Sequence, residues 1–136
     1  MSGVAIIRAL LAASPEITAM VSADRIRAGV VPQDVALPNI SVTSVSGREL
    51  ETVARAGPRV TIRERVQVTV HTATYATQKA LIQATRLGPG IHHGTVAGFD
   101  VKAVQPDVVG PDLNNLDDDG IYEQSRDFIV TFAEAS

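Results

Sequence analysis

Residues 60–72 read VTIRERVQVTVHT, the longest regular pattern in the chain. Apolar side chains occupy alternate positions on one face, and mainly polar or charged side chains occupy the other, so the pattern predicts a β-strand. Glu64 alone interrupts the apolar face. At about 3.3 Å per residue the strand would span about 43 Å, whereas a compact chain of this length has a diameter of about 37 Å. We therefore expect an arm that extends beyond its own domain and contacts other copies of the protein.

The remaining periodicities predict an α+β fold with the element order ααβββαββ. Helices should cover one face of a mainly antiparallel sheet of four or five strands, within a single domain spanning residues 1–136. The expected helices are Gly3–Ala13, Pro15–Val21 and Tyr75–Leu87, and the expected further strands are Arg25–Val30, Asn39–Ser46, Phe99–Gln105 and Ile121–Phe132.

Three further features belong to this prediction. A stripe of Ala76, Ala80, Ala84 and Leu87 should pack the third helix on the sheet. Gly47–Arg59 and Pro106–Gly120 show no regular period and are expected to be long connections. The first of these, with the start of the long strand, makes a loop or arm at about 47–65.

Bulk composition indicates a water-soluble intracellular protein. The chain has 136 residues, a net charge of −3 and no cysteine, so disulfides and thiolate zinc sites are excluded. The apolar stretch Val4–Ala13 is too short to cross a bilayer and contains Arg8, so we expect neither a signal peptide nor a membrane helix.

Charge is segregated along the chain. Arg48–Arg65 holds five arginines and three glutamates, whereas Pro106–Gly120 holds five aspartates and no basic residue. Arginine is favoured in ion pairs at interfaces because its planar guanidinium can bind a carboxylate with two hydrogen bonds. The simpler interpretation is two solvated loops of opposite sign.

Motifs for catalysis or cofactors are absent from the sequence. Gly88–Gly94 has the wrong glycine spacing for a phosphate loop and follows a helix. Asn115–Gly120 resembles the start of a calcium loop, but Arg126 stands where the bidentate glutamate belongs. His71, His92 and His93 lack a fourth ligand. We therefore expect no enzyme activity, no cofactor and no metal.

Several short motifs, in this order, resemble a known family. They are RIRAGVVPQ at 25–33, Leu37-Pro38 before a strand, VQVTV at 66–70 leading into Thr74-Tyr75-Ala76, and GIYEQSRDFIV at 120–130, all after two tandem helices. The chain is similar to the tail-completion, or tail-terminator, proteins of long-tailed bacteriophages, prophages and gene-transfer agents. The likeness covers nearly the whole chain.

This resemblance implies a virion structural protein rather than an enzyme. Such a subunit would form a hexameric ring that caps the tail tube and joins the tail to the head connector. Its partners would be further copies of itself, the tail tube protein and a connector or neck protein. It would be located at the head–tail junction of the virion after assembly in the host cytoplasm. DNA would pass through without specific binding, and no membrane or cofactor would be involved.

A ring needs two different, complementary patches on each subunit. The predicted patches are Arg55, Arg59, Arg63 and Arg65 on one subunit and Asp117, Asp118 and Asp119 on its neighbour. A second hypothesis places some acidic side chains in the lumen of the ring, where they would repel the phosphates of passing DNA.

Other functions are open at this level of analysis. The chain could be another neck or connector subunit, or a monomeric or dimeric adaptor outside viruses that uses the long loop to bind a protein. A small enzyme has no positive support. Nucleic-acid binding is disfavoured because no aromatic residues accompany the basic stripe.

Overall fold

The computed structural model describes residues 2–29, 36–50, 59–86, 94–111, 113–115 and 121–135. Within them, the α-helices are α1 (Gly3–Ala12), α2 (Pro15–Thr18) and α3 (Tyr75–Ala84), and η1 (Ala23–Arg25) is a short 3₁₀ helix. The strands are β1 (Ile26–Ala28), β2 (Asn39–Leu50), β3 (Arg59–Thr72), β4 (Gly94–Val96), β5 (Phe99–Val109), β6 (Leu113–Asn115) and β7 (Ile121–Ala135).

The described strands form one seven-stranded sheet. Its order is β1-β2-β3-β7-β5-β4, and β6 also pairs with β7. Every pairing is antiparallel except that of β1 with β2. The expected α+β class and mainly antiparallel sheet are confirmed, but the expected strand number of four or five is wrong. The two extra strands, β4 and β6, have three residues each, too few to show an alternating pattern.

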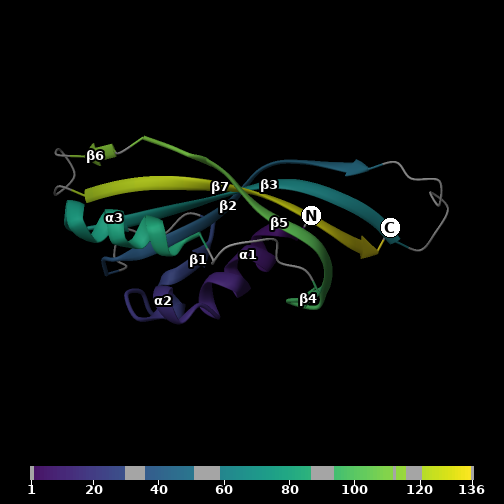
Figure 1. Cartoon of the computed structure of the whole chain (residues 1–136), viewed down its shortest axis with the longest axis horizontal. Helices are drawn as coiled ribbons and strands as arrows, with labels where there is room; N and C mark the ends of the chain where they lie inside the picture. Colours follow the sequence, from purple (N-terminus) through teal and green to yellow (C-terminus); the bar gives the residue numbers. More distant parts are fainter. Residues whose placement is uncertain are drawn as a thin grey trace.

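The centre of the sheet is the long pairing of β3 with β7. It runs without a register shift from Arg59 opposite Ala135 to Thr72 opposite Tyr122. The 14 residues of β3 confirm the long strand that the sequence predicts. The sheet curls around the helices, and the ends of β2, β3 and β7 continue past them (Figure 1). We call the outer half of β2 and β3, residues 44–50 and 59–65, the arm; its inner face is still covered at Ile62 and Glu64, which are fully buried.

The core lies between the inner face of the sheet and the helices. Val66, Val68 and Val70 of β3 are fully buried, as are Phe128, Val130 and Phe132 of β7 and Ile6, Ile7 and Leu11 of α1. Each such side chain contributes about 1.5–3 kcal/mol through burial. The helices α1 and α3 contact the same face of the sheet, as predicted.

The face of α3 that packs on the sheet differs from the prediction. Ala84 is buried as predicted, and Leu87 lies outside the described residues. Ala76 and Ala80 are exposed, and Gln78, Leu81 and Ile82 are buried instead. The buried face of α3 is not apparent from a hydrophobicity pattern, because one of its residues, Gln78, is polar. Its Nε2 donates a hydrogen bond of 2.7 Å to the backbone oxygen of Glu123 in β7, which allows the amide to be buried.

Two strands extend into segments that were expected to be connections. β2 continues to Leu50, opposite Thr61 of β3, and β5 continues to Val109, opposite Arg126 of β7. Residues 44–49 and 105–109 are exposed, so no buried face marks them in the sequence. Backbone pairing with a neighbouring strand holds them instead.

Candidate interaction surface

The part of the chain that the structure describes offers no metal centre and no membrane helix. No group of three or more histidine, cysteine, aspartate or glutamate residues within it could hold a metal ion. None of its helices is both long enough and apolar enough to cross a membrane.

The predicted interface residues divide into two groups. Arg63 and Arg65 lie on β3 with their side chains on the outer face, away from the helices, because residues 62, 64 and 66 are buried on the inner face. Arg59 begins β3, but its side chain is not described. Arg55, Asp117, Asp118 and Asp119 lie outside the described residues, as do His92 and His93.

Arg65 is held by carboxylates of its own chain. Its Nη1 lies 2.6 Å from Oδ2 of Asp107 and 3.0 Å from Oδ2 of Asp127. Gln67 donates from Nε2 to the other carboxylate oxygen of Asp127 at 3.3 Å. The hydrogen bonds of Arg65 with Asp107 and Asp127 raise its pKa, and the bond with Asp107 has the larger effect. The network joins β3, β5 and β7 and neutralises Arg65 within the subunit.

Arg63 has a different environment. Its direct cross-strand neighbour is Arg48 of β2, and both residues are exposed. Within the described residues, neither arginine has a carboxylate within ion-pair distance. Arg48 is not among the interface residues predicted from the sequence, because its position opposite Arg63 depends on the register of β2 with β3.

A register shift determines that position. Thr43 lies opposite Gln67, but the pairing shifts between Ser44 and Ser46, so that Ser46 lies opposite Arg65. Without this β-bulge Arg48 would face Ile62, on the buried side of β3. The bulge turns Arg48 to the outer face, beside Arg63.

Glu64 explains the one break in the apolar pattern of β3. It is fully buried, and its Oε1 accepts a hydrogen bond of 3.0 Å from the backbone N–H of Gly3, at the start of α1. A carboxylate at a helix N-terminus is stabilised by the helix dipole and by the free N–H groups there. Glu64 therefore joins the first helix to the arm.

His71 lies on the outer face near the other end of β3. Its Nε2 is 3.2 Å from Oε2 of Glu123 on β7. Burial lowers the pKa of His71, and the carboxylate of Glu123 opposes that shift. His71 and Glu123 thus form a structural pair that joins β3 to β7.

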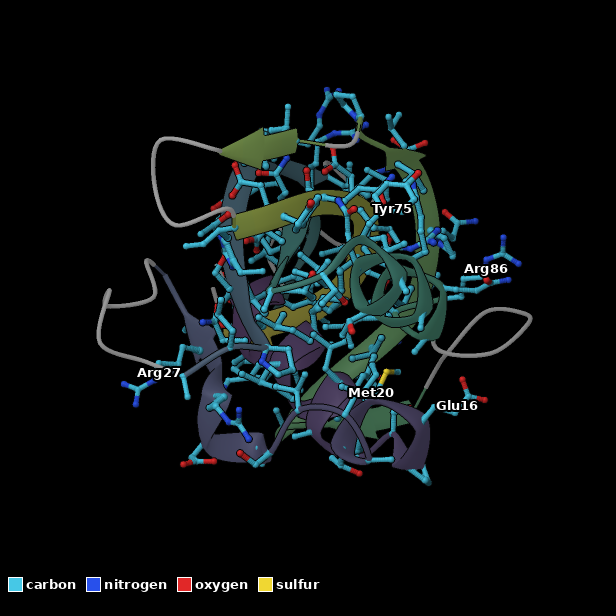
Figure 2. The ribbon with its side chains drawn as sticks, turned by 90° about the vertical axis from the view of Figure 1, so that its left-hand side faces the viewer. Glu16, Met20, Arg27, Tyr75 and Arg86 are labelled. Atoms are coloured by element: carbon cyan, nitrogen blue, oxygen red, sulfur yellow. The ribbon has the colours of Figure 1, made fainter. Side chains whose placement is uncertain are left out.

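The end of the molecule opposite the arm is partly apolar. Val108, Val109 and Leu113 are exposed there, and so is Tyr75 at the start of α3. The ring of Tyr75 packs edge-on against Tyr122 with centroids 6.3 Å apart, and Nζ of Lys79 lies 5.1 Å from its centroid. Figure 2 views this end and shows Glu16, Arg27 and Arg86 pointing outward. This end therefore exposes more large apolar side chains than the arm, where Val45 is exposed.

Comparisons with known proteins agree with this architecture. A chain of the solved structure "Virion of native gene transfer agent (GTA) particle" matches with a TM-score of 0.67 and 14% sequence identity, over 96% of this chain and 93% of that chain. This likeness shows a shared fold. The comparison with curated proteins found no match.

A family model identifies the chain from its sequence. The model described as "Tail completion protein gp17" matches residues 5–86, which run from within α1 past the end of α3 and include the whole arm. This match covers more than half of the chain and agrees with the resemblance noted from its motifs. The protein therefore belongs to the tail completion protein gp17 family of bacteriophage structural proteins.

Proposed function

We propose that this tail protein forms a hexameric ring that caps the finished tail tube and joins it to the connector of the head. In this role the subunit is not an enzyme, and its place in the virion is the head–tail junction. The observation that carries the proposal is the arm, in which the strands continue past the helices (Figure 1). Its exposed arginines have no carboxylate partner among the residues that the structure describes.

The arm suits a head-to-tail contact between copies. A ring requires a patch on each subunit that binds a different patch on the next. Arg55, Arg59 and Arg63 supply the positive patch in this proposal, and Asp117–Asp119 of the neighbour supply the negative one. Arg65 is omitted from it because its described partners are Asp107 and Asp127 of the same chain.

The two ends of the subunit provide for two further partners. The apolar end around Val108, Val109 and Leu113 and the charged arm present different chemistry. A protein that joins a tail tube to a connector must bind two unlike surfaces. DNA would pass through the ring without specific binding, with acidic side chains of the lumen repelling its phosphates.

Another neck or connector subunit is the second candidate function. Membership of a tail completion family favours a virion role over a non-viral adaptor. Binding to tubes assembled from the tube protein of the same particle separates the two virion roles. Electron microscopy should show the protein at one tip of each tube, whereas a connector subunit without the capping role would leave the tips bare.

Assembly can be tested with two complementary charge variants. The first carries Arg55→Glu, Arg59→Glu and Arg63→Glu, and the second carries Asp117→Lys, Asp118→Lys and Asp119→Lys. Each variant alone should stay monomeric, since every interface would join like charges. An equimolar mixture should assemble, because subunits that alternate around a ring of even number pair opposite charges at every interface.

Light scattering over a dilution series at two salt concentrations gives the readout. The wild-type ring should have a mass of about 86 kDa, six times the 14.4 kDa of one chain, and should weaken at high salt. A mixture that stays monomeric while the wild type assembles would reject the charge pairing. Wild-type protein that neither assembles nor binds tube tips would reject the ring itself.

A further inference from the structure

Arg48 and Arg63 form a like-charge pair on the outer face of the arm. They are direct cross-strand neighbours of an antiparallel ladder, which places their Cβ atoms about 4.5–5.5 Å apart. Like charges in this position destabilise a sheet. Both side chains are exposed, and the described chain provides neither with a carboxylate partner.

The next arginine on the same face shows the contrast. Arg65 follows Arg63 by two residues on β3 and contacts Asp107 and Asp127 at 2.6 and 3.0 Å. The subunit therefore neutralises its outer face along the centre of the sheet. It leaves two positive charges side by side farther out along the arm.

The β-bulge of β2 creates this arrangement. Without the register shift between Ser44 and Ser46, Arg48 would face the side of Ile62 and not that of Arg63. β-Bulges commonly redirect a side chain where a surface has a function. Two adjacent guanidinium groups offer up to ten N–H donors, an arrangement that matches an oxyanion.

We propose that Arg48 and Arg63 together form a clamp that binds a side-chain carboxylate of a neighbouring copy of this chain. The proposal rests on the ring described above and adds Arg48 to the interface. The candidate source of the carboxylate is the arginine-free Pro106–Gly120 segment, which has four aspartates besides the Asp107 that pairs with Arg65. A carboxylate fits better than a DNA phosphate because the chain has a net charge of −3 and residues 44–50 and 59–65 contain no aromatic residue to stack on bases.

Charge reversal in such a clamp should weaken assembly of the ring and stabilise the isolated subunit. Arg63→Glu and, separately, Arg48→Glu should each raise the dissociation constant of the ring by at least about tenfold. The same single reversals should raise the unfolding temperature of the isolated subunit, because each converts a repulsive cross-strand pair into an attractive one. The double reversal restores like charges, so it should lose both the assembly and the gain in stability.

Sedimentation velocity measures assembly. Thermal unfolding in low salt, on protein diluted below the concentration at which rings form, measures the subunit alone without screening the pair. Arg27→Glu is the matched control, because Arg27 is an exposed arginine on the short edge strand β1 and points away from the body (Figure 2). The control should assemble like the wild type. Fluorescence anisotropy with a labelled DNA duplex is measured in parallel for every variant.

Each contrary result has a distinct meaning. Unchanged rings from both single reversals would overturn the clamp and leave the proposed ring intact. Equal loss of assembly in Arg27→Glu would show a net-charge effect and also overturn it. Loss of DNA binding with unchanged assembly would assign the pair to phosphate. Wild-type protein that remains monomeric at every concentration would reject the clamp together with the ring.

Discussion

Arg126 of β7 closes the C-terminal end of α3 by a hydrogen bond from its Nε to Oγ1 of Thr85, at 3.1 Å. Its Nη2 also donates to the backbone oxygen of Ile82 at 3.1 Å, which accepts a second hydrogen bond from the Thr85 hydroxyl. Burial, with the nearby charge of Arg86, lowers the pKa of Arg126. The arginine in the last position of the supposed calcium loop therefore has a structural role in fixing α3 to the sheet.

Arg126→Met should destabilise the protein by about 1–3 kcal/mol, because it leaves the buried oxygen atoms of Ile82 and Thr85 with fewer donors. Urea unfolding measures the change. Arg86→Met is the control, since Arg86 is an exposed arginine near the same helix end and should cost less than about 0.5 kcal/mol. Equal effects from the two substitutions would contradict the capping role.

Gly3→Ala should destabilise the protein by about 1–3 kcal/mol through overpacking. A Cβ at this position would lie 2.9 Å from Cδ and Oε1 of Glu64 and 2.9 Å from Cγ2 of Val66. Glycine to alanine in a helix is otherwise favourable by roughly 0.5–1 kcal/mol. Chemical denaturation in a double-mutant cycle with Glu64→Ala checks the cause, because removing the carboxylate should relieve the part of the penalty due to Glu64 and leave the part due to Val66. Strictly additive effects would refute it.

The stability of the fold should decrease as the pH falls through the range of His71. Burial lowers the pKa of this histidine in the folded state, so the unfolded state takes up its proton first and is favoured below the ordinary histidine value. Above both pKa values the residue contributes no pH dependence. The slope is limited to about 1.4 kcal/mol per pH unit for one proton.

Urea unfolding of the wild type and of His71→Gln between pH 7.5 and pH 5 tests this. The variant should lose the part of the slope that His71 causes. Identical slopes in the two proteins would exclude His71 as the source.

Arg65→Met should lower the unfolding temperature slightly and leave assembly unchanged. The substitution removes the ion pairs with Asp107 and Asp127, but those partly exposed contacts lie within one subunit. Differential scanning fluorimetry and light scattering, run beside Arg63→Glu, separate the two roles. Disassembly of the ring by Arg65→Met would place Arg65 at the interface after all.

The sequence predicts best where one face of an element is buried along its whole length. The alternating pattern of apolar residues in β3 reveals the length of the strand, because Val66, Val68 and Val70 all face the core. The outer half of β2 has no buried face, so its pairing up to Leu50 leaves no pattern. A buried polar residue also obscures the pattern. Gln78 lies on the buried face of α3, although its polarity predicts an exposed position.

The candidate interface was only partly predictable. Arg63 is exposed, as its position in the pattern of β3 requires, but its relation to Arg48 depends on a bulge that sequence periodicity does not show. Arg65 belongs to the same pattern and yet has partners from β5 and β7. Only the fold brings those distant carboxylates near it.

The ladder between β3 and β7 also determines when the protein can fold. Its paired residues are separated by 50 to 76 positions along the chain, from Thr72 with Tyr122 to Arg59 with Ala135. Pairings this distant in sequence form slowly, because bringing the two strands together closes a long loop and loses entropy before the contacts compensate for it. During synthesis, β3 must wait for β7 to leave the ribosome, with one edge and much of its apolar face unprotected. β3 therefore stays without its β7 partner until that strand has been made, and chaperones can protect it in the meantime.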